Sequence, residues 1–185
     1  MANFDTDLVR KNIRHRGRTT GKVDSVSGAL RVKAGGSIAL ADLMRMVPMG
    51  ENTRPVRITV QVKEISGTPI LTNPSFSVGI SPISASNYTR PDGVVFSPVT
   101  ASATRLGAST ALTTDEMAQF TEIDTVADVQ NWAPYYVTLT PSGAGAFSVA
   151  GGDVDVILTV EFLGEHQANE PVYSEFLPNG GKYKN

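Results

Sequence analysis

The stretch that decides the fold is residues 35–65, GGSIALADLMRMVPMGENTRPVRITVQVKEI. From residue 55 onward it alternates, with apolar Ile58, Val60 and Val62 separated by polar or charged residues. A period of two is typical of a half-buried strand, because successive side chains point to opposite faces of a sheet. The sequence therefore predicts a strand over residues 55–65.

The first half of the stretch has a different pattern. Its apolar residues recur at near-helical spacing, with Ser37 placed as an N-cap and Pro48 as a stop. This spacing predicts a short helix over residues 40–47. The run SIAL at residues 37–40 fits a strand equally well.

Short apolar runs separated by turn residues continue along the rest of the chain. The 17 Gly and 11 Pro fall between these runs, as in an all-β protein with many turns. Alternation predicts further strands over residues 75–81, 135–140 and 153–162. We also expect a hairpin over residues 23–32 that turns at Ser27-Gly28, loops over 82–93 and 98–115, and a short helix near 115–120.

Charge divides the chain unevenly. Residues 1–33 carry eight Lys or Arg against three acidic residues, a net charge of +5, whereas the remainder has a net charge of −7. The first 22 residues have few apolar side chains and no sustained period, and the chain turns polar again after Gly164. We predict a basic N-terminal arm (1–22) that is ordered by a partner, a β-rich body (23–164) and a C-terminal tail (165–185) that docks on its own body or on a neighbour. The alternative for both ends is a disordered tail.

The two ends supply the candidate partner-binding residues. A basic arm can contact nucleic-acid phosphates or dock on an acidic protein surface, and we favour protein docking because Phe4 is the only aromatic residue in the arm that could stack on a base. Spaced aromatic side chains in the tail are typical of a segment that docks in a groove. The predicted partner-binding residues are Arg10, Lys11, Arg14, Arg16, Arg18, Tyr173 and Phe176.

No pattern in the sequence predicts catalysis, a metal site or a cofactor. There is no cysteine, and the two histidines, His15 and His166, lie outside any known motif. Asp153 and Asp155 could ligate Ca²⁺, but charge protection of a strand edge explains them as well. The acidic residues between 115 and 128 are typical of a solvated surface. We therefore expect a protein that is not an enzyme.

Residues 35–62 resemble small virion structural proteins of tailed bacteriophages. Many of these proteins combine a Gly-Ser and I-x-L run, a short apolar segment, a turn with glycine and an alternating strand. The later strand DVDVILTVEF, residues 153–162, is similar to the closing strands of that group. The resemblance implies an antiparallel β-sandwich of about eight strands with jelly-roll character and extended arms. It implies no catalytic residue.

The resemblance also implies a function and partners. We expect a capsid decoration (cement) protein that forms a homotrimer, clamps the major capsid protein or other virion proteins on the capsid exterior, and assembles in the host cytoplasm. Contact of the arm with nucleic acid is the less favoured alternative, and no membrane contact is expected. Alternative functions are a head-to-tail, tail or head-fibre component, or a carbohydrate-binding module that would use Trp132, Tyr135 and Tyr136.

Overall fold

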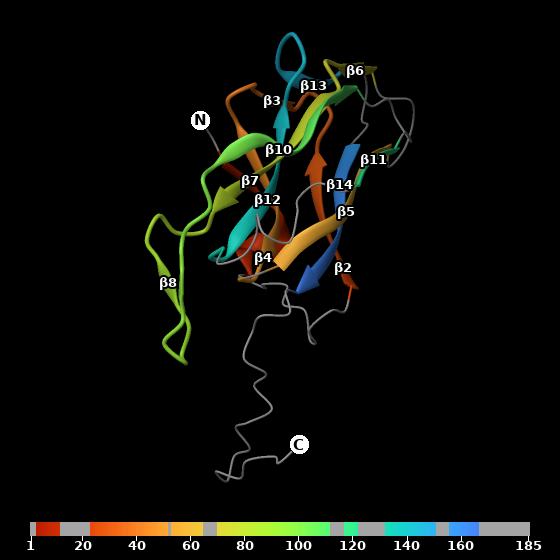
Figure 1. The fold of residues 1–185 in the computed structure, drawn as a ribbon. Coiled ribbons are helices and arrows are strands. Elements are labelled where there is room, and N and C mark those ends of the chain that lie inside the picture. The colour runs from red at the N-terminus through yellow and green to blue at the C-terminus, as the bar shows by residue number, and fades with distance from the viewer. Residues whose placement is uncertain are drawn as a thin grey trace.

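A computed structural model describes residues 3–11, 23–51, 53–64, 70–111, 117–121, 132–150 and 156–166. Within these ranges the chain forms fourteen strands and one helix of four residues, so the prediction of an all-β protein is confirmed (Figure 1). The elements are β1 Asn3–Asp5, α1 Asp7–Arg10, β2 Val23–Val32, β3 Ser37–Ile38, β4 Leu43–Met49, β5 Thr53–Glu64, β6 Ile70–Thr72, β7 Ser75–Pro82, β8 Tyr88–Thr89, β9 Val95–Phe96, β10 Ser102–Ala111, β11 Met117–Thr121, β12 Tyr135–Pro141, β13 Phe147–Ala150 and β14 Val156–His166.

Eight strands build the two main sheets of a jelly roll. One sheet has the order β11-β5-β14-β2, and the other contains β4-β12-β7-β10 with β1 added beside β4. In chain order, the first of these eight strands pairs with the last, the second with the seventh, the third with the sixth and the fourth with the fifth. These antiparallel pairs are β2 with β14, β4 with β12, β5 with β11 and β7 with β10. This nested pairing is that of a long hairpin rolled into a double-sheet sandwich. The predicted antiparallel sandwich with jelly-roll character is therefore confirmed.

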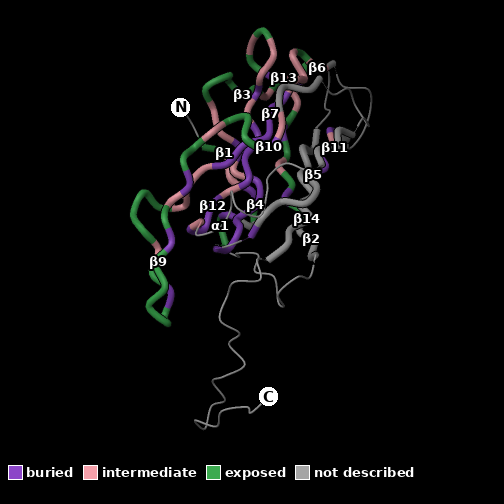
Figure 2. Tube along the Cα trace, in the orientation of Figure 1, coloured by how far each residue is buried: buried purple, intermediate pink, exposed green. Residues whose placement is uncertain are grey.

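The core lies between the two sheets, where apolar side chains of both inner faces meet. Figure 2 shows buried stretches of the trace around β4, β7 and β12. Close packing of this kind is what holds two sheets face to face. The four-stranded sheet contributes Val32 from β2 together with Ile58, Val60 and Val62 from β5, as their alternation predicts. The five-stranded sheet contributes buried side chains from each of its long strands: Met44, Met46, Val47, Met49, Phe76, Val78, Ile80, Leu106, Tyr135, Val137 and Leu139.

The helix predicted over residues 40–47 is wrong. Residues 39–42 form a turn closed by the amide of Asp42 donating to the Ala39 carbonyl at 2.9 Å, and β4 begins at Leu43. Opposite β4, Val137 pairs with Val47 but Thr138 pairs with Arg45, so Met46 is the extra residue of a β-bulge. A bulge reverses the alternation, which explains why Met44 and Met46 are buried before it and Val47 and Met49 after it. Apolar residues spaced in this way imitate helical periodicity.

The predicted hairpin over residues 23–32 is also wrong, because β2 runs through Gly28 without turning. A Cβ atom at Gly28 would collide with the backbone carbonyl of Met46 on β4. The glycine therefore lets β2 pass close to the backbone of β4, and it serves close packing instead of a turn.

Two further segments differ from expectation. Residues 98–115 contain β10, which pairs with β7 along the five-stranded sheet, where a surface excursion was predicted. Residues 117–121 form β11 on β5 in place of a helix. Both segments are edge strands of their sheets and are poor in large apolar residues. Because their apolar content is low, the sequence pattern did not indicate strands there. The loop predicted over 82–93 is largely exposed, as expected, and includes the short strand β8.

Candidate interaction surfaces

The described residues hold no group of three or more His, Asp or Glu side chains able to bind a metal ion. The structure does not describe several of the candidate ligands: His15, Asp153, Asp155 and the acidic residues between 115 and 128. His166 is the last residue of β14. In the ranges that the structure describes, no helix is long and apolar enough to cross a bilayer.

The aromatic cluster considered for sugar binding does not form an exposed platform. Tyr135 is fully buried, and its hydroxyl donates to the Thr53 carbonyl at 2.7 Å. Trp132 is half-buried, meets Tyr135 edge to face, and has the Arg105 guanidinium 5.6 Å from its ring centroid. Tyr136 lies under Arg45 at 5.1 Å. The three rings therefore serve packing and cation–π contacts.

The N-terminal residues 3–11 lie on the edge of the five-stranded sheet. β1 pairs with β4 in parallel, with Asp5 opposite Arg45. The Arg45 guanidinium donates to both carboxylate oxygens of Asp5 at 2.6 Å, and both side chains are about three-quarters buried. This hydrogen bonding raises the pKa of Arg45 against the opposing effect of burial. A bidentate pair of this kind fixes the position of β1 along β4.

Beyond β1, two side chains anchor the turn into α1. The Thr6 hydroxyl donates to the Met46 carbonyl at 2.7 Å, so it binds the backbone at the bulge of β4. Val9 is 7% exposed and closes the segment over the body. This docking on the chain's own sheet differs from the expectation that residues 3–11 order only on a partner. Of the predicted partner-binding residues, Arg10 and Lys11 are exposed here.

The remaining predicted partner-binding residues lie outside the described ranges: Arg14, Arg16, Arg18, Tyr173 and Phe176. The boundaries at residues 22 and 164 stay predictions. One observation bears on the second boundary, since β14 continues to His166 and pairs there with Thr53. The C-terminal tail as predicted would therefore begin inside a strand.

Sequence reasoning missed a second surface, the hairpin formed by β8 and β9. It projects from the sandwich in Figure 1. Its base is held on residues 132–134. The Ile83 amide donates to the Pro134 carbonyl at 3.3 Å, and the Ala133 amide donates to the Ser97 carbonyl at 2.7 Å. The hairpin is therefore fixed at both of its ends.

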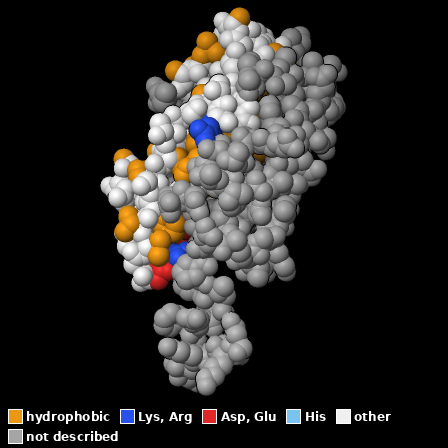
Figure 3. Space-filling model, viewed as in Figure 1, with side chains coloured by type: hydrophobic (Ala, Val, Ile, Leu, Met, Phe, Trp, Pro, Cys, Tyr) orange, Lys and Arg blue, Asp and Glu red, His pale blue; other side chains and the backbone are white. Residues whose placement is uncertain are grey.

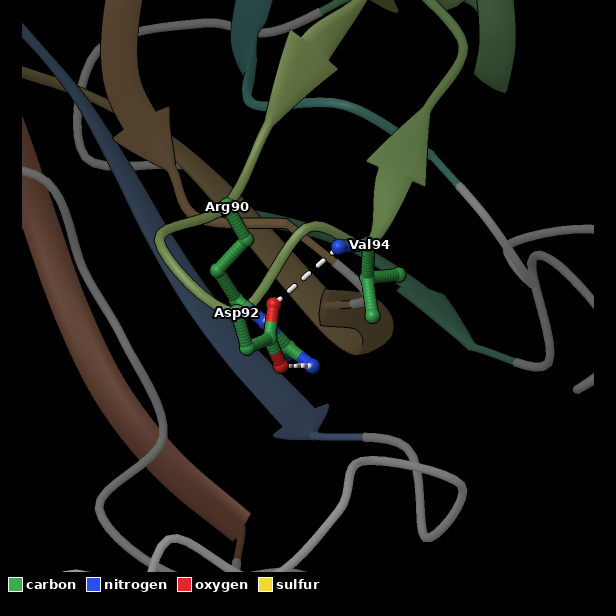
Figure 4. A network of polar contacts seen from close by, with 3 residues as sticks. All are labelled: Arg90, Asp92 and Val94. Atoms are coloured by element: carbon green, nitrogen blue, oxygen red, sulfur yellow. Dashed lines mark hydrogen bonds and ion pairs between the residues drawn. The ribbon is translucent and has the colours of Figure 1, made fainter.

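An ion pair holds the tip of this hairpin in one shape (Figure 4). The Arg90 guanidinium is 2% exposed, lies 5.4 Å from the Phe96 ring centroid and donates to the Asp92 carboxylate at 2.7 Å. Asp92 also accepts from the Val94 amide at 3.2 Å. Gly93 has a φ of 89°, which glycine adopts without strain. The hydrogen bonds from Arg90, foremost, lower the pKa of Asp92.

The hairpin presents apolar side chains to solvent. Val94 and Val95 are 37% and 52% exposed, and Leu40 is the other large apolar side chain exposed in the described ranges. Figure 3 shows hydrophobic side chains along the edge of the molecule where Figure 1 places β8. A small hollow lies at the base, lined by Ile83, Ser84, Ser86, Tyr88, Ala133 and Pro134. These exposed valines make the hairpin a candidate contact surface.

With the strand connectivity known, comparison with solved structures becomes informative. The chain is similar in fold to a chain in the structure "Capsid of Ralstonia phage GP4". The alignment has a TM-score of 0.56 and covers 90% of this chain and 99% of the capsid chain, at 15% sequence identity. No protein-family model and no curated protein matches the sequence. At this identity the likeness concerns the fold alone.

Proposed function

We propose that this protein is a structural component of a bacteriophage virion. The observation that carries the proposal is the likeness of its jelly roll to a phage capsid chain over 99% of that chain. Fold alone does not determine function, so the proposal also draws on the surface. The described surface offers a rigid projecting hairpin and an edge-docked N-terminal segment, features that suit contacts between proteins.

Within the virion, we assign the chain to capsid decoration. A small sandwich that sits on the capsid exterior as a homotrimer would place identical hairpins on a ring of neighbouring capsid subunits. The exposed Val94 and Val95 would supply apolar contact, while the fixed Arg90–Asp92 tip lowers the entropy lost on binding. The basic N-terminal region would reach adjacent subunits of its own kind or the major capsid protein.

Location on the particle tests this proposal directly. Antibodies raised against the purified protein should label the heads of virions that contain the chain in negative-stain electron microscopy. Label at the neck, tail or fibres would replace decoration with a head-to-tail, tail or head-fibre role. Absence of the protein from purified virions by mass spectrometry would contradict the virion function itself.

Oligomeric state tests the trimer. Light scattering on a size-exclusion column should give three times the 19.7 kDa chain mass for the full-length protein. The variant Val95→Ser serves as a surface control for the hairpin, because it keeps the fold and should keep the trimer while weakening binding to capsids. A full-length protein that stays monomeric at all concentrations would contradict self-association.

A further inference from the structure

We propose that residues 3–11 are an exchangeable segment, whose β1 docks on β4 of a neighbouring copy when copies are packed together. This inference rests on the proposed virion function, because it names the partner of the N-terminal region as a second copy of the same chain. It also names the acceptor, the edge of β4 that β1 occupies. The structure shows the closed arrangement, in which the segment fills the acceptor of its own copy.

The acceptor is a short slot with a fixed register. β1 pairs with only three residues of β4, Asn3 with Leu43, Phe4 with Met44 and Asp5 with Arg45. The bulge at Met46 ends the slot, and the Thr6 hydroxyl occupies the carbonyl there. These contacts join residues 3–6 to β4, and α1 lies against β4 and β2. A segment from another copy would make the same contacts.

The segment is an addition to the jelly roll and not one of its members. The eight strands of the sandwich are complete without it, and every pairing among them is antiparallel. The pairing of β1 with β4 is the one parallel pairing between named strands in the described ranges. Removing β1 from its own copy would therefore leave the main sheets intact, which is the requirement for exchange of an element at low cost.

The connecting chain gives the segment a defined reach beyond its own body. Eleven residues, 12–22, join Lys11 to the start of β2, and they could span roughly 36–40 Å when fully extended. In the closed arrangement Thr6 and Gly28 both lie at the Met46 carbonyl. The segment and β2 are therefore close together within one copy, and residues 12–22 need not be fully extended to join them. A short tether gives an effective concentration of about the millimolar range. Neighbours on a crowded particle surface reach similar concentrations, whereas dilute copies do not.

Cross-linking tests the exchange without interference, because the chain has no cysteine. Full-length Asn3→Cys and Leu43→Cys variants are mixed in equal amounts, concentrated to about the millimolar range at which the tether competes, and oxidised. We expect disulfide-linked dimers that contain one copy of each variant, with the bond between positions 3 and 43 identified by mass spectrometry. Asn3→Cys mixed with Ser97→Cys, an exposed position on the hairpin, is the matched control and should give several-fold fewer dimers.

A chain that carries both substitutions is the reference for closed docking. In dilute solution it should cross-link within one chain and remain a monomer on a non-reducing gel. If the mixture of single variants gives no more dimer than the Ser97→Cys control while the double variant closes internally, the segment docks only on its own copy and the exchange is overturned. That result would leave virion labelling unaffected, so the failure of this inference is distinct from failure of the proposed function.

Charge reversal gives an independent readout that needs no oxidation. Asp5→Arg alone and Arg45→Asp alone each place like charges at the docking site, so each should lose concentration-dependent association. Mixed together, the two variants can pair Arg and Asp across copies, and association should return. Circular dichroism of each variant checks that the sandwich is folded. Folded variants whose mixture associates no better than either one alone would contradict exchange.

Discussion

At the level of single residues, the Arg90–Asp92 pair makes the hairpin sensitive to acid. Hydrogen bonds from Arg90 lower the pKa of Asp92 from its ordinary value of 3.8. A depressed pKa in the folded state means that the pair stabilises the hairpin fully above pH 3.8, and that this stability is lost as the pH falls through the lowered value.

We therefore expect NMR signals of residues 88–96 to be constant down to about pH 4 and to shift together below it, with a midpoint under the ordinary value for Asp. Asp92→Asn should abolish this transition while the sandwich remains folded. A midpoint at or above 3.8 in the unmodified protein would contradict the ion pair.

Gly28 provides a second prediction at this scale. Gly28→Ala places a methyl group against the Met46 carbonyl, which belongs to the backbone of β4 and has little freedom to move. We expect a loss of about 1–3 kcal/mol in the free energy of unfolding, measured by urea denaturation. Ser27→Ala, at the adjacent exposed position, should change stability by less than about 0.5 kcal/mol. Equal effects of the two substitutions would mean that the sheets do not approach at Gly28.

At the level of elements, β1 and α1 contribute to stability although they lie outside the jelly roll. Deletion of residues 1–11 removes the buried Val9 and uncovers the edge of β4, and burial of a valine contributes about 1.5–3 kcal/mol. We expect a truncated chain that is folded but has lost about this much stability in urea denaturation. Arg10→Ala, an exposed substitution in the same helix, is the control.

Two outcomes would contradict this account of the N-terminal segment. Unchanged stability would mean that residues 3–11 do not dock on the sheet. Complete unfolding by circular dichroism would mean that they belong to the core of the sandwich. We also expect the body to fold without residues 1–22 but to assemble less well, and truncation extended to residue 22 tests this.

At the scale of the whole molecule, the nested pairing of strands determines how the chain folds. β2 pairs with β14 and β4 pairs with β12, so the core forms only when distant parts of the chain meet. Non-local pairing of this kind folds slowly, in about milliseconds to seconds. Stopped-flow refolding can follow the single tryptophan, Trp132, which packs on Tyr135. Refolding in microseconds would be incompatible with this topology.

Much of the fold was predictable because local alternation determined it. β5, β7 and β12 follow directly from period-two patterns, and the many Gly and Pro residues indicated an all-β chain. The candidate site was predictable only in part. Partner binding by Arg10 and Lys11, which are exposed, stays a prediction. Nothing in the pattern of residues 82–97 marks the hairpin, whose shape depends on the ion pair between Arg90 and Asp92.

The sequence by itself determined which segments are strands where one face is apolar and the other polar, and it indicated the class of fold. Only the tertiary structure decided that residues 43–49 and 23–32 form the single strands β4 and β2, and that residues 3–11 dock on the sheet. A bulge at Met46 broke the alternation of β4, contact between sheets required Gly28, and the pairing of Asp5 with Arg45 joined positions 40 residues apart. These features depend on neighbours that are distant in sequence, so no local pattern could contain them.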